Sequence, residues 1–378
     1  MKSLSLIFIL SLLLSCSAFA SAFTYGAEFE LVHDSITKGW ERGGKEQAAD
    51  AKITFVKNIQ ALCKSMGCKV EEVQGKWRMD VPARSHDYKV TLSDGWWFKV
   101  SHDPGCIEIT TKPSTQAELR AREQTLNKMI FESGKPLGFK VPENESAHFN
   151  IGFHSAFEGK GDPFLRFFVD YHNRPELALG ALGMDIHNGP PLSIMTPKMR
   201  EALAELVNDH NNEKIDASMI AHRIQQKVYL RPYTLSWNGA HHYQMIGLKH
   251  ITQASESLEV LDQPFELRAI WNQHDMNQFL LLAELFEARI NYLKTKSEAI
   301  IYTEARGDIF SNIEKAAGFY NYVTESGLDY ERYKQLLPAK VQQIDIELVQ
   351  AKAKQMAVRL EEDKDKIRGF YKRCAMMF

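Results

Sequence analysis

Apolar and polar side chains alternate in a short stretch near the N-terminus, TYGAEFEL. In an extended strand, successive side chains point to opposite faces. Ala27, Phe29 and Leu31 would therefore form an apolar face. Glu28 and Glu30 would lie together on the other face. Such a pair is also typical of a strand whose polar face meets solvent, so its meaning depends on the strands beside it.

Three later runs repeat this alternation: GCIEITT, HFNIGF and PFELRAI. Their polar-face side chains are Glu108, His148, Asn150, Glu266 and Arg268. Each run alone means little, because a lone histidine is usually structural and Glu266 with Arg268 is typical of a same-face ion pair. The shared register of the four runs predicts one sheet with a polar, acidic face.

The pattern elsewhere predicts the remaining elements. Strands are indicated in KVEEV, KWRMDV, YKVTLSD, WWFKVSHD and GCIEITTKP, which Gly, Pro and Asp separate. A helix is expected over about 114–134, capped by Ser114. AHFNIGFHSAF and PFLRFFVDYH are predicted as two strands that EGKGD joins as a hairpin turn. Helices are expected from Pro190 to about 228, and again after PFELRAI to the end of the chain.

These elements predict an α+β fold with a curved, largely antiparallel sheet, helices packed on one side and a helical C-terminal region. Three segments are expected: a signal peptide at 1–20, a catalytic domain at 21–275 and a helical region at 276–378 that packs on it. The formal net charge of -2 argues against a nucleic-acid partner, which would require a clustered excess of Lys and Arg.

The N-terminus has the pattern of an export signal. Met1 and Lys2 precede SLSLIFILSLLLS, an apolar run too short to span a bilayer comfortably, and small residues follow. A core helix is the disfavoured alternative, because no polar side chains pattern one face. An ordinary signal peptidase would cut after Ala20, whereas LLSC resembles a bacterial lipobox with a lipidated Cys16. We favour the lipobox and expect a periplasmic, membrane-anchored or secreted protein.

Cys63 lies near the end of a helix-like stretch that Gly67 would end, and Cys68 follows that glycine. An oxidising compartment permits a disulfide between them but does not require one. Their spacing does not suit the usual zinc knuckles.

The spaced motifs resemble the carboxylate-amine ligases of the glutamine synthetase and glutamate-cysteine ligase superfamily, and within it the amidoligase group. G-x-E-x-E on a first strand, a Glu shortly before a Pro, an H-x-N strand and a closing E-x-R strand carry the resemblance, over about 24–270. It implies a glutamine synthetase-like catalytic domain that uses ATP with Mg²⁺ or Mn²⁺. Its substrates would be a carboxylate and an amine, of amino acid or peptide type.

The resemblance also implies roles for individual residues. The implied metal ligands are Glu28, Glu30, Glu108, His148 and Glu266. His148 would also lie near the nucleotide phosphates, and Arg268 would stabilise the transferring phosphoryl group. Asn150 stands where some members have a second histidine, and Gly247 where the pattern has an asparagine. These departures bear on nucleotide geometry and acceptor choice more than on metal binding.

The chemistry gives these residue types a reason. Magnesium prefers oxygen ligands and completes its shell with water and substrate phosphates. Carboxylates gathered without a cation repel one another and raise their own pKa values, which favours a metal. Arg268, with its planar set of donors, suits the charge on a transferring phosphoryl group.

Other polar residues allow two interpretations. Asp170, Asn173 and Arg174 would suit a substrate carboxylate or phosphate, but also turn and helix-capping roles. Arg231 allows the same two interpretations, and both arginines are candidate nucleotide-binding residues. The adjacent His241 and His242 would face opposite ways on a strand, which is poor geometry for one metal.

Export from the cytoplasm is in tension with ATP use, because little ATP is present outside the bacterial cytosol. Three alternatives follow: a ligase delivered into a compartment that contains ATP, a secreted metal-dependent amide hydrolase or transferase on the same fold, or a noncatalytic binding lipoprotein of the envelope. The ligase is the preferred hypothesis and the hydrolase is the second.

The lipobox hypothesis predicts a change of location. Cys16→Ala should release a membrane-associated protein into the soluble fraction, because the lipidated side chain is lost. Cell fractionation measures this, and a native N-terminus at Ser21 in mass spectrometry would contradict lipidation.

Overall fold

A computed structural model describes most of the chain. The described residues are 23–36, 45–75, 86–103, 105–143, 146–184, 189–229, 244–253, 263–305 and 307–375. The expected signal peptide with Cys16, the KWRMDV strand, Arg231, His241 and His242 lie outside them.

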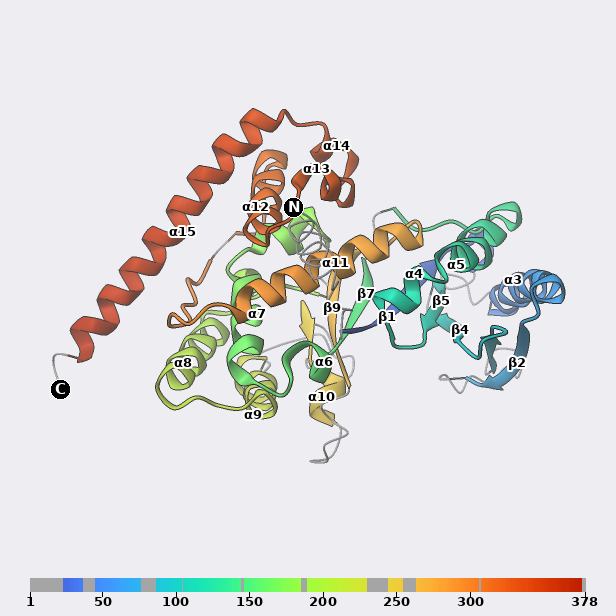
Figure 1. Cartoon of the computed structure of the whole chain (residues 1–378), viewed down its shortest axis with the longest axis horizontal. Coiled ribbons are helices and arrows are strands. Elements are labelled where there is room, and N and C mark those ends of the chain that lie inside the picture. Colours follow the sequence, from blue (N-terminus) through green and yellow to red (C-terminus); the bar gives the residue numbers. More distant parts are fainter. Residues whose placement is uncertain are drawn as a thin grey trace, which may run out of the picture.

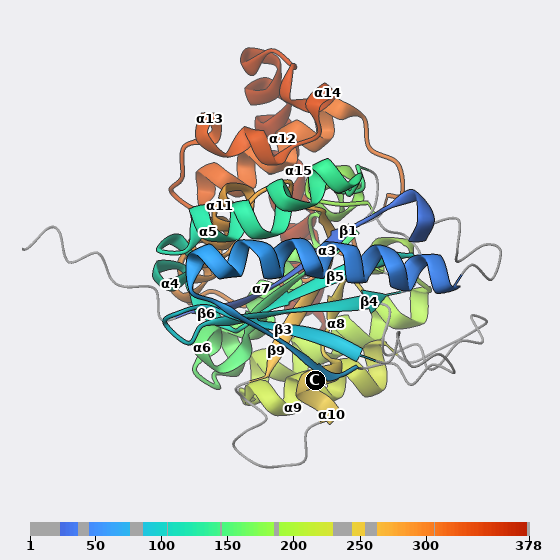
Figure 2. The same ribbon diagram turned by 90° about the vertical axis from the view of Figure 1, so that its right-hand side faces the viewer.

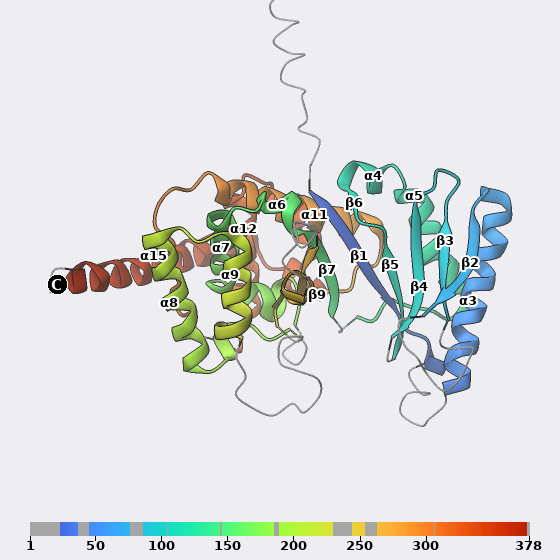
Figure 3. The same cartoon turned by 90° about the horizontal axis from the view of Figure 1, so that it is seen from below.

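The described strands form one nine-stranded sheet in which every pairing is antiparallel. They are β1 (Thr24–Leu31), β2 (Lys69–Gln74), β3 (His86–Thr91), β4 (Trp97–Asp103), β5 (Cys106–Thr111), β6 (Ser114–Thr115), β7 (Ser146–Gly152), β8 (Ile246–Gly247) and β9 (Pro264–Trp271). The order is β2-β3-β4-β5-β1-β7-β9-β8, with β6 also paired to β1. Figure 3 shows β7, β1, β5, β4, β3 and β2 lying side by side. The predicted α+β class with an antiparallel sheet is confirmed.

Thirteen α-helices have their bounds in the described part of the chain, beside a short helical stretch at 34–36. They are α3 (Lys45–Met66), α4 (Gln116–Arg120), α5 (Glu123–Leu126), α6 (Phe153–Phe157), α7 (Gly161–His172), α8 (Pro197–Glu213), α9 (Ala217–Arg223), α10 (Lys249–Gln253), α11 (Met276–Lys294), α12 (Asn312–Glu325), α13 (Tyr330–Tyr333), α14 (Ala339–Gln342) and α15 (Ile346–Ala375). Figures 1 and 2 show α11 and α3 lying across the strands.

The two faces of β1 differ as its sequence predicts. Buried and partly exposed residues alternate along the whole strand, with the apolar side chains buried. On this apolar face, the ring of Phe149 lies 4.8 Å from Phe279 and 5.5 Å from Phe286 of α11, between ring centroids. Phe167 of α7 packs on Phe265 of β9 at 5.6 Å. The aromatic core therefore fixes the helices to one face and leaves the acidic side chains on the other.

The C-terminal region continues from this helix layer. Helix α12 contacts α11, and α15 packs on α12 before running along the outer side of the molecule (Figure 1). Nowhere in the described ranges is a helix both long enough and apolar enough to cross a membrane.

The predicted hairpin of two strands is wrong in its second half. After β7 the chain forms α6, and PFLRFFVDYH lies in α7. Most of α7 is buried, and its apolar side chains run almost continuously. Asp162, Arg166 and Asp170 nevertheless recur every four residues, which is the spacing of one helix face. EGKGD includes the left-handed residue Glu158 that ends α6. A continuous apolar run does not by itself distinguish a buried helix from a strand.

The helix expected over 114–134 is interrupted. Ser114 lies in β6, and the cap is Thr115, which begins α4. Helix α5 and a π-helical segment at Asn127–Glu132 follow.

The structure joins Cys63 and Cys68 in a disulfide at the end of α3. Between them, Gly67 has a φ of +72°, and its N–H donates to the carbonyl of Cys63. This left-handed glycine is a common way to end a helix, as the sequence predicts.

Glu176 is an acidic side chain buried between α7 and α12. It is 6% exposed and packs on Gly318, where a Cβ would lie 2.4 Å from the Glu176 Cγ. Only glycine fits this close approach without a shift. Burial raises the pKa of Glu176 to about 7.

This pKa predicts how stability depends on pH. The carboxyl titrates near 4.5 when unfolded and near 7 when folded, so the free energy of unfolding should fall as pH rises through this window. Glu176→Gln should therefore be more stable than wild type by about 3 kcal/mol above about pH 7, and by little near about pH 4.5. Urea unfolding at both pH values measures this, with the exposed Glu213→Gln on α8 as control. An equal difference at both pH values would contradict it.

Candidate functional site

The register of the sheet gathers the polar-face residues. Glu28 of β1 lies opposite His148 of β7, and Asn150 lies opposite Glu266 of β9. Because paired residues point to the same face, these side chains meet on the polar side of the sheet. We call Glu28, His148 and Glu266 the carboxylate–histidine cluster.

Hydrogen bonds connect the cluster. His148 Nδ1 lies 2.8 Å from Glu28 Oε2 and 3.2 Å from Glu266 Oε1. Asn150 Nδ2 donates to Glu28 Oε1 at 2.9 Å. Arg268 Nη1 donates to Glu266 Oε2 at 2.7 Å. Both carboxylates are therefore oriented by neighbours on the same face.

A β-bulge places Arg268 beside the cluster. Ala147 pairs with Ile270, but Phe149 pairs with Leu267, so β9 uses one residue more than β7. Arg268 and Ala269 thus both lie opposite His148. Bulges of this kind re-aim side chains near functional sites, and here Arg268 contacts Glu266 two residues earlier in the same strand.

Glycines make room around β9. A Cβ at Gly183 would lie 1.7 Å from the Ala269 carbonyl oxygen, and one at Gly247 would lie 2.9 Å from Glu266 Oε2. The sequence resemblance suggests an asparagine at position 247. Gly247 instead leaves the space that the Glu266 carboxylate occupies.

Burial and neighbouring charges shift the pKa values of two cluster residues, His148 and Glu266. Burial lowers the pKa of His148, but the carboxylates of Glu266 and Glu28 outweigh it and raise this pKa to about 9. Burial raises the pKa of Glu266, but His148 and Arg268 lower it to about 2. The side chains of Glu28 and His148 are 19% and 21% exposed, so the cluster reaches the surface.

The cluster fits a metal ion. One ligand atom from each of Glu28, His148 and Glu266 lies within 4.8 Å of the others. Two carboxylate oxygens and one imidazole nitrogen suit Mg²⁺ or Mn²⁺, which prefer oxygen but accept nitrogen. The side chains on this face also orient the ligands by hydrogen bonds, as metal sites require.

The remaining two predicted metal ligands lie one step further along the strands. Glu30 and Glu108 face each other directly across β1 and β5. Asn272 Nδ2 donates to Glu30 Oε2 at 3.4 Å, and Thr110 Oγ1 donates to Glu108 Oε1 at 3.0 Å. The structure therefore brings the five predicted ligands to one face, as a group of three with an acidic pair beside it.

Arg174 is not part of this site. Its Nη2 donates to Glu325 at 2.6 Å, and its Nε lies 3.3 Å from Asp170, which also pairs with Arg289. All four side chains belong to α7, α11, α12 or the turn after α7, on the helix side of the sheet. Arg174 therefore lies apart from the carboxylate–histidine cluster, and its nucleotide-binding role stays a prediction. Arg231 lies outside the described residues.

Sequence reasoning missed Asn272, which is 4% exposed and bonded to Glu30. It follows the end of β9, where strand alternation no longer indicates which way a side chain points. No periodicity signal marks it.

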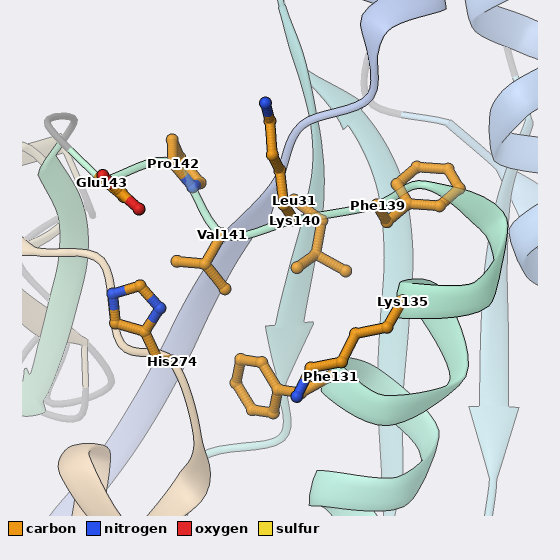
Figure 4. A pocket seen from close by; sticks show the side chains of 9 residues that line it. All are labelled: Leu31, Phe131, Lys135, Phe139, Lys140, Val141, Pro142, Glu143 and His274. Atoms are coloured by element: carbon orange, nitrogen blue, oxygen red, sulfur yellow. The ribbon is translucent and has the colours of Figure 1, made fainter.

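A cavity of about 510 Å³ lies at the end of β1 (Figure 4). Leu31, Phe131 and Val141 give it apolar walls, and Lys135 and His274 also line it. Leu31 belongs to the apolar face of β1, so this cavity is separate from the carboxylate–histidine cluster.

Comparisons with known proteins give structural matches alone. No protein-family profile and no curated protein matches the sequence. A solved structure of GmaS in complex with ADP matches at a TM-score of 0.32 and 12% identity, covering 94% of this chain and 73% of that one. Ligand-free GmaS matches at 0.28 and 12%, covering 92% and 69%. Scores of this size do not establish a shared fold, and the chemistry of the cluster follows from its own residues.

The cluster predicts binding of a divalent cation. Mg²⁺ or Mn²⁺ at about 100 times its Kd should stabilise the protein by about 2.7 kcal/mol, because the folded state alone holds the ligands together. Glu28→Gln and Glu266→Gln should abolish the increase in melting temperature, and Glu347→Gln, on the exposed first turn of α15, should keep it. Equal increases in all variants would disprove the site.

Proposed function

We propose that this chain is an ATP-dependent carboxylate-amine ligase that forms an amide or peptide-like bond. The observation that carries the proposal is the carboxylate–histidine cluster with Arg268 at its side, on one face of an antiparallel sheet. The same residues carry the sequence resemblance to ligases of the glutamine synthetase type. Export to the periplasm or beyond, with or without a lipid anchor at Cys16, is part of the proposal.

The proposed reaction has two steps. An oxygen of the substrate carboxylate bonds to the γ-phosphorus of ATP, while the bond from that phosphorus to the β,γ-bridging oxygen breaks and ADP leaves. The amine nitrogen then bonds to the acyl carbon of the acyl phosphate. The bond from this carbon to the phosphate oxygen breaks, inorganic phosphate leaves, and the nitrogen loses one proton to water.

The cluster residues would hold the reacting groups. Glu28, His148 and Glu266 would bind a Mg²⁺ or Mn²⁺ ion, which neutralises phosphate charge when bound. Glu30 and Glu108 form the adjacent acidic pair and would suit a second ion.

Arg268 and Asn150 would serve as donors. The planar guanidinium of Arg268 is fixed by its bond to Glu266 and would stabilise charge on the transferring phosphoryl group. Asn150 donates to Glu28 and would hold that carboxylate in place. It would also lie close to the bound nucleotide.

A metal-dependent amide hydrolase is the second candidate. The export-like N-terminus favours it, because hydrolysis needs no ATP. The same two carboxylates and histidine could bind a metal that activates water.

Two variants distinguish the loss of a metal ligand from the loss of a contact to the transition state. Glu28→Gln keeps the side-chain size but removes a charge, so it should weaken Mg²⁺-dependent ATP binding. Arg268→Lys keeps the charge but loses the planar set of donors, so ATP should still bind while kcat falls about a hundredfold. Arg223→Lys, at an ion pair on α9, should change neither quantity.

The assay follows ADP and phosphate release by the mature protein with Mg²⁺, ATP and a panel of amino acids and short peptides as acid and amine. Wild type should release both products with a suitable pair. If it binds no nucleotide and releases no ADP with any pair, yet cleaves amides in a metal-dependent way, the hydrolase replaces the ligase.

A further inference from the structure

Two lysines continue the row of side chains that contains Glu28. Thr110 lies opposite Glu28, Lys99 of β4 lies opposite Thr110, and Lys89 of β3 lies opposite Lys99. Paired residues point to the same face, so both lysines lie on the polar face with the carboxylate–histidine cluster. Strands are about 4.8 Å apart, which places the backbone of Lys99 about 10 Å from Glu28 and that of Lys89 about 14 Å from it.

The two ammonium groups flank one aromatic ring. Lys89 Nζ lies 5.1 Å from the centroid of the Trp97 ring, and Lys99 Nζ lies 5.7 Å from it. Trp97 and both lysines are half-buried. We call these three residues the lysine–tryptophan patch.

The patch has an unbalanced positive charge. Like charges directly opposite each other in a sheet are unfavourable, and Lys89 and Lys99 are such a pair. Glu71 lies opposite Lys89 and attracts it electrostatically, but its Oε1 bonds to Lys69 Nζ at 2.5 Å. Within the described ranges, no carboxylate forms an ion pair with Lys89 or Lys99. An anionic group bound between the two lysines would relieve their repulsion.

We infer that the patch binds a second anionic group of the acid substrate, at the end remote from the reacting carboxylate. The inference rests on the proposed ligase function. The backbones of Lys99 and Lys89 lie about 10 and about 14 Å from that of Glu28. This distance corresponds to three or four residues of extended peptide, at about 3.3 Å per residue. The acid is therefore an elongated, peptide-like diacid.

The same charges argue against the nucleotide as the occupant. The phosphates of ATP belong at the carboxylate–histidine cluster, so its uncharged base would be the part that reached the patch. Two ammonium groups add little to the binding of a neutral ring, and they already cover the ring face that a base would use. A second carboxylate or phosphate on the acid makes use of both lysines.

A length series tests the inference. N-succinyl-oligoglycines with one to five glycines carry a carboxylate at each end, and versions amidated at the C-terminus lack one. Isothermal titration with Mg²⁺ should show the tightest binding for spacings of three or four residues. Lys89→Gln with Lys99→Gln should weaken diacid binding about three- to tenfold, as expected for partly exposed charges, and leave the amidated versions unchanged.

Two controls accompany the double variant. Lys57→Gln with Lys64→Gln makes the same charge change on the exposed side of α3 and should leave diacid affinity as in wild type. The melting temperature of the patch variant should equal or exceed that of wild type, because lysine repulsion is relieved.

The outcomes separate the inference from the ligase proposal, because ATP binding and ADP release are measured on the same samples. If ATP binds and turns over but diacid affinity depends on neither spacing nor the patch lysines, the inference is wrong and the ligase stands. If the patch variant weakens ATP binding and not diacid binding, the inference is wrong and the patch serves the nucleotide. If no ADP forms but diacid binding follows spacing and the lysines, the ligase fails and the diacid site stands.

Discussion

Strand β1 is hydrogen-bonded to β5 on one edge and to β7 on the other, and this central position constrains the rest of the site. With both edges paired and one face packed under aromatic rings, the strand cannot slip by one residue without burying Glu28 and Glu30 in the core. The register across β7 and β9 then follows from side-chain packing. Each functional side chain is thus fixed by the apolar residues on either side of it along its strand.

The cluster also has to satisfy its own electrostatics. Two carboxylates, Glu28 and Glu266, meet within hydrogen-bonding distance of one imidazole. The charges of His148 and Arg268 balance them, which explains how the folded chain tolerates this arrangement. The positive lysine–tryptophan patch lies further along the same face. The acidic pair of Glu30 and Glu108 and the positive patch therefore give this face opposite charges in two zones, which would orient an elongated anion.

Strand alternation made the cluster predictable from sequence. E-x-E, H-x-N and E-x-R each reveal which side chains share a face, because the period of a strand is two. The sequence did not predict which of these side chains would contact one another. Glu30 and Glu108 pair with each other across β1 and β5, and the position of Arg268 depends on a bulge in the pairing of β7 with β9. Arg174 could not be assigned at all, because its partner Glu325 lies 151 residues away. Helix α7 was predicted as a strand because its apolar run was given more weight than the four-residue spacing of Asp162, Arg166 and Asp170.

The ion pairs around Asp170 have a consequence for how the chain reaches this structure. Arg289 of α11 bonds both oxygens of Asp170 at 2.8 and 2.5 Å, across a separation of 119 residues, and also reaches Glu325 of α12. Arg289 is 1% exposed. In a chain synthesised only as far as the turn after α7, Asp170 would have Arg174 as a partner but would lack both bonds from Arg289. Such distant contacts favour slow, cooperative folding in which the core closes late. The ion pairs that join α7, α11 and α12 can therefore form only after the C-terminal helices have been synthesised.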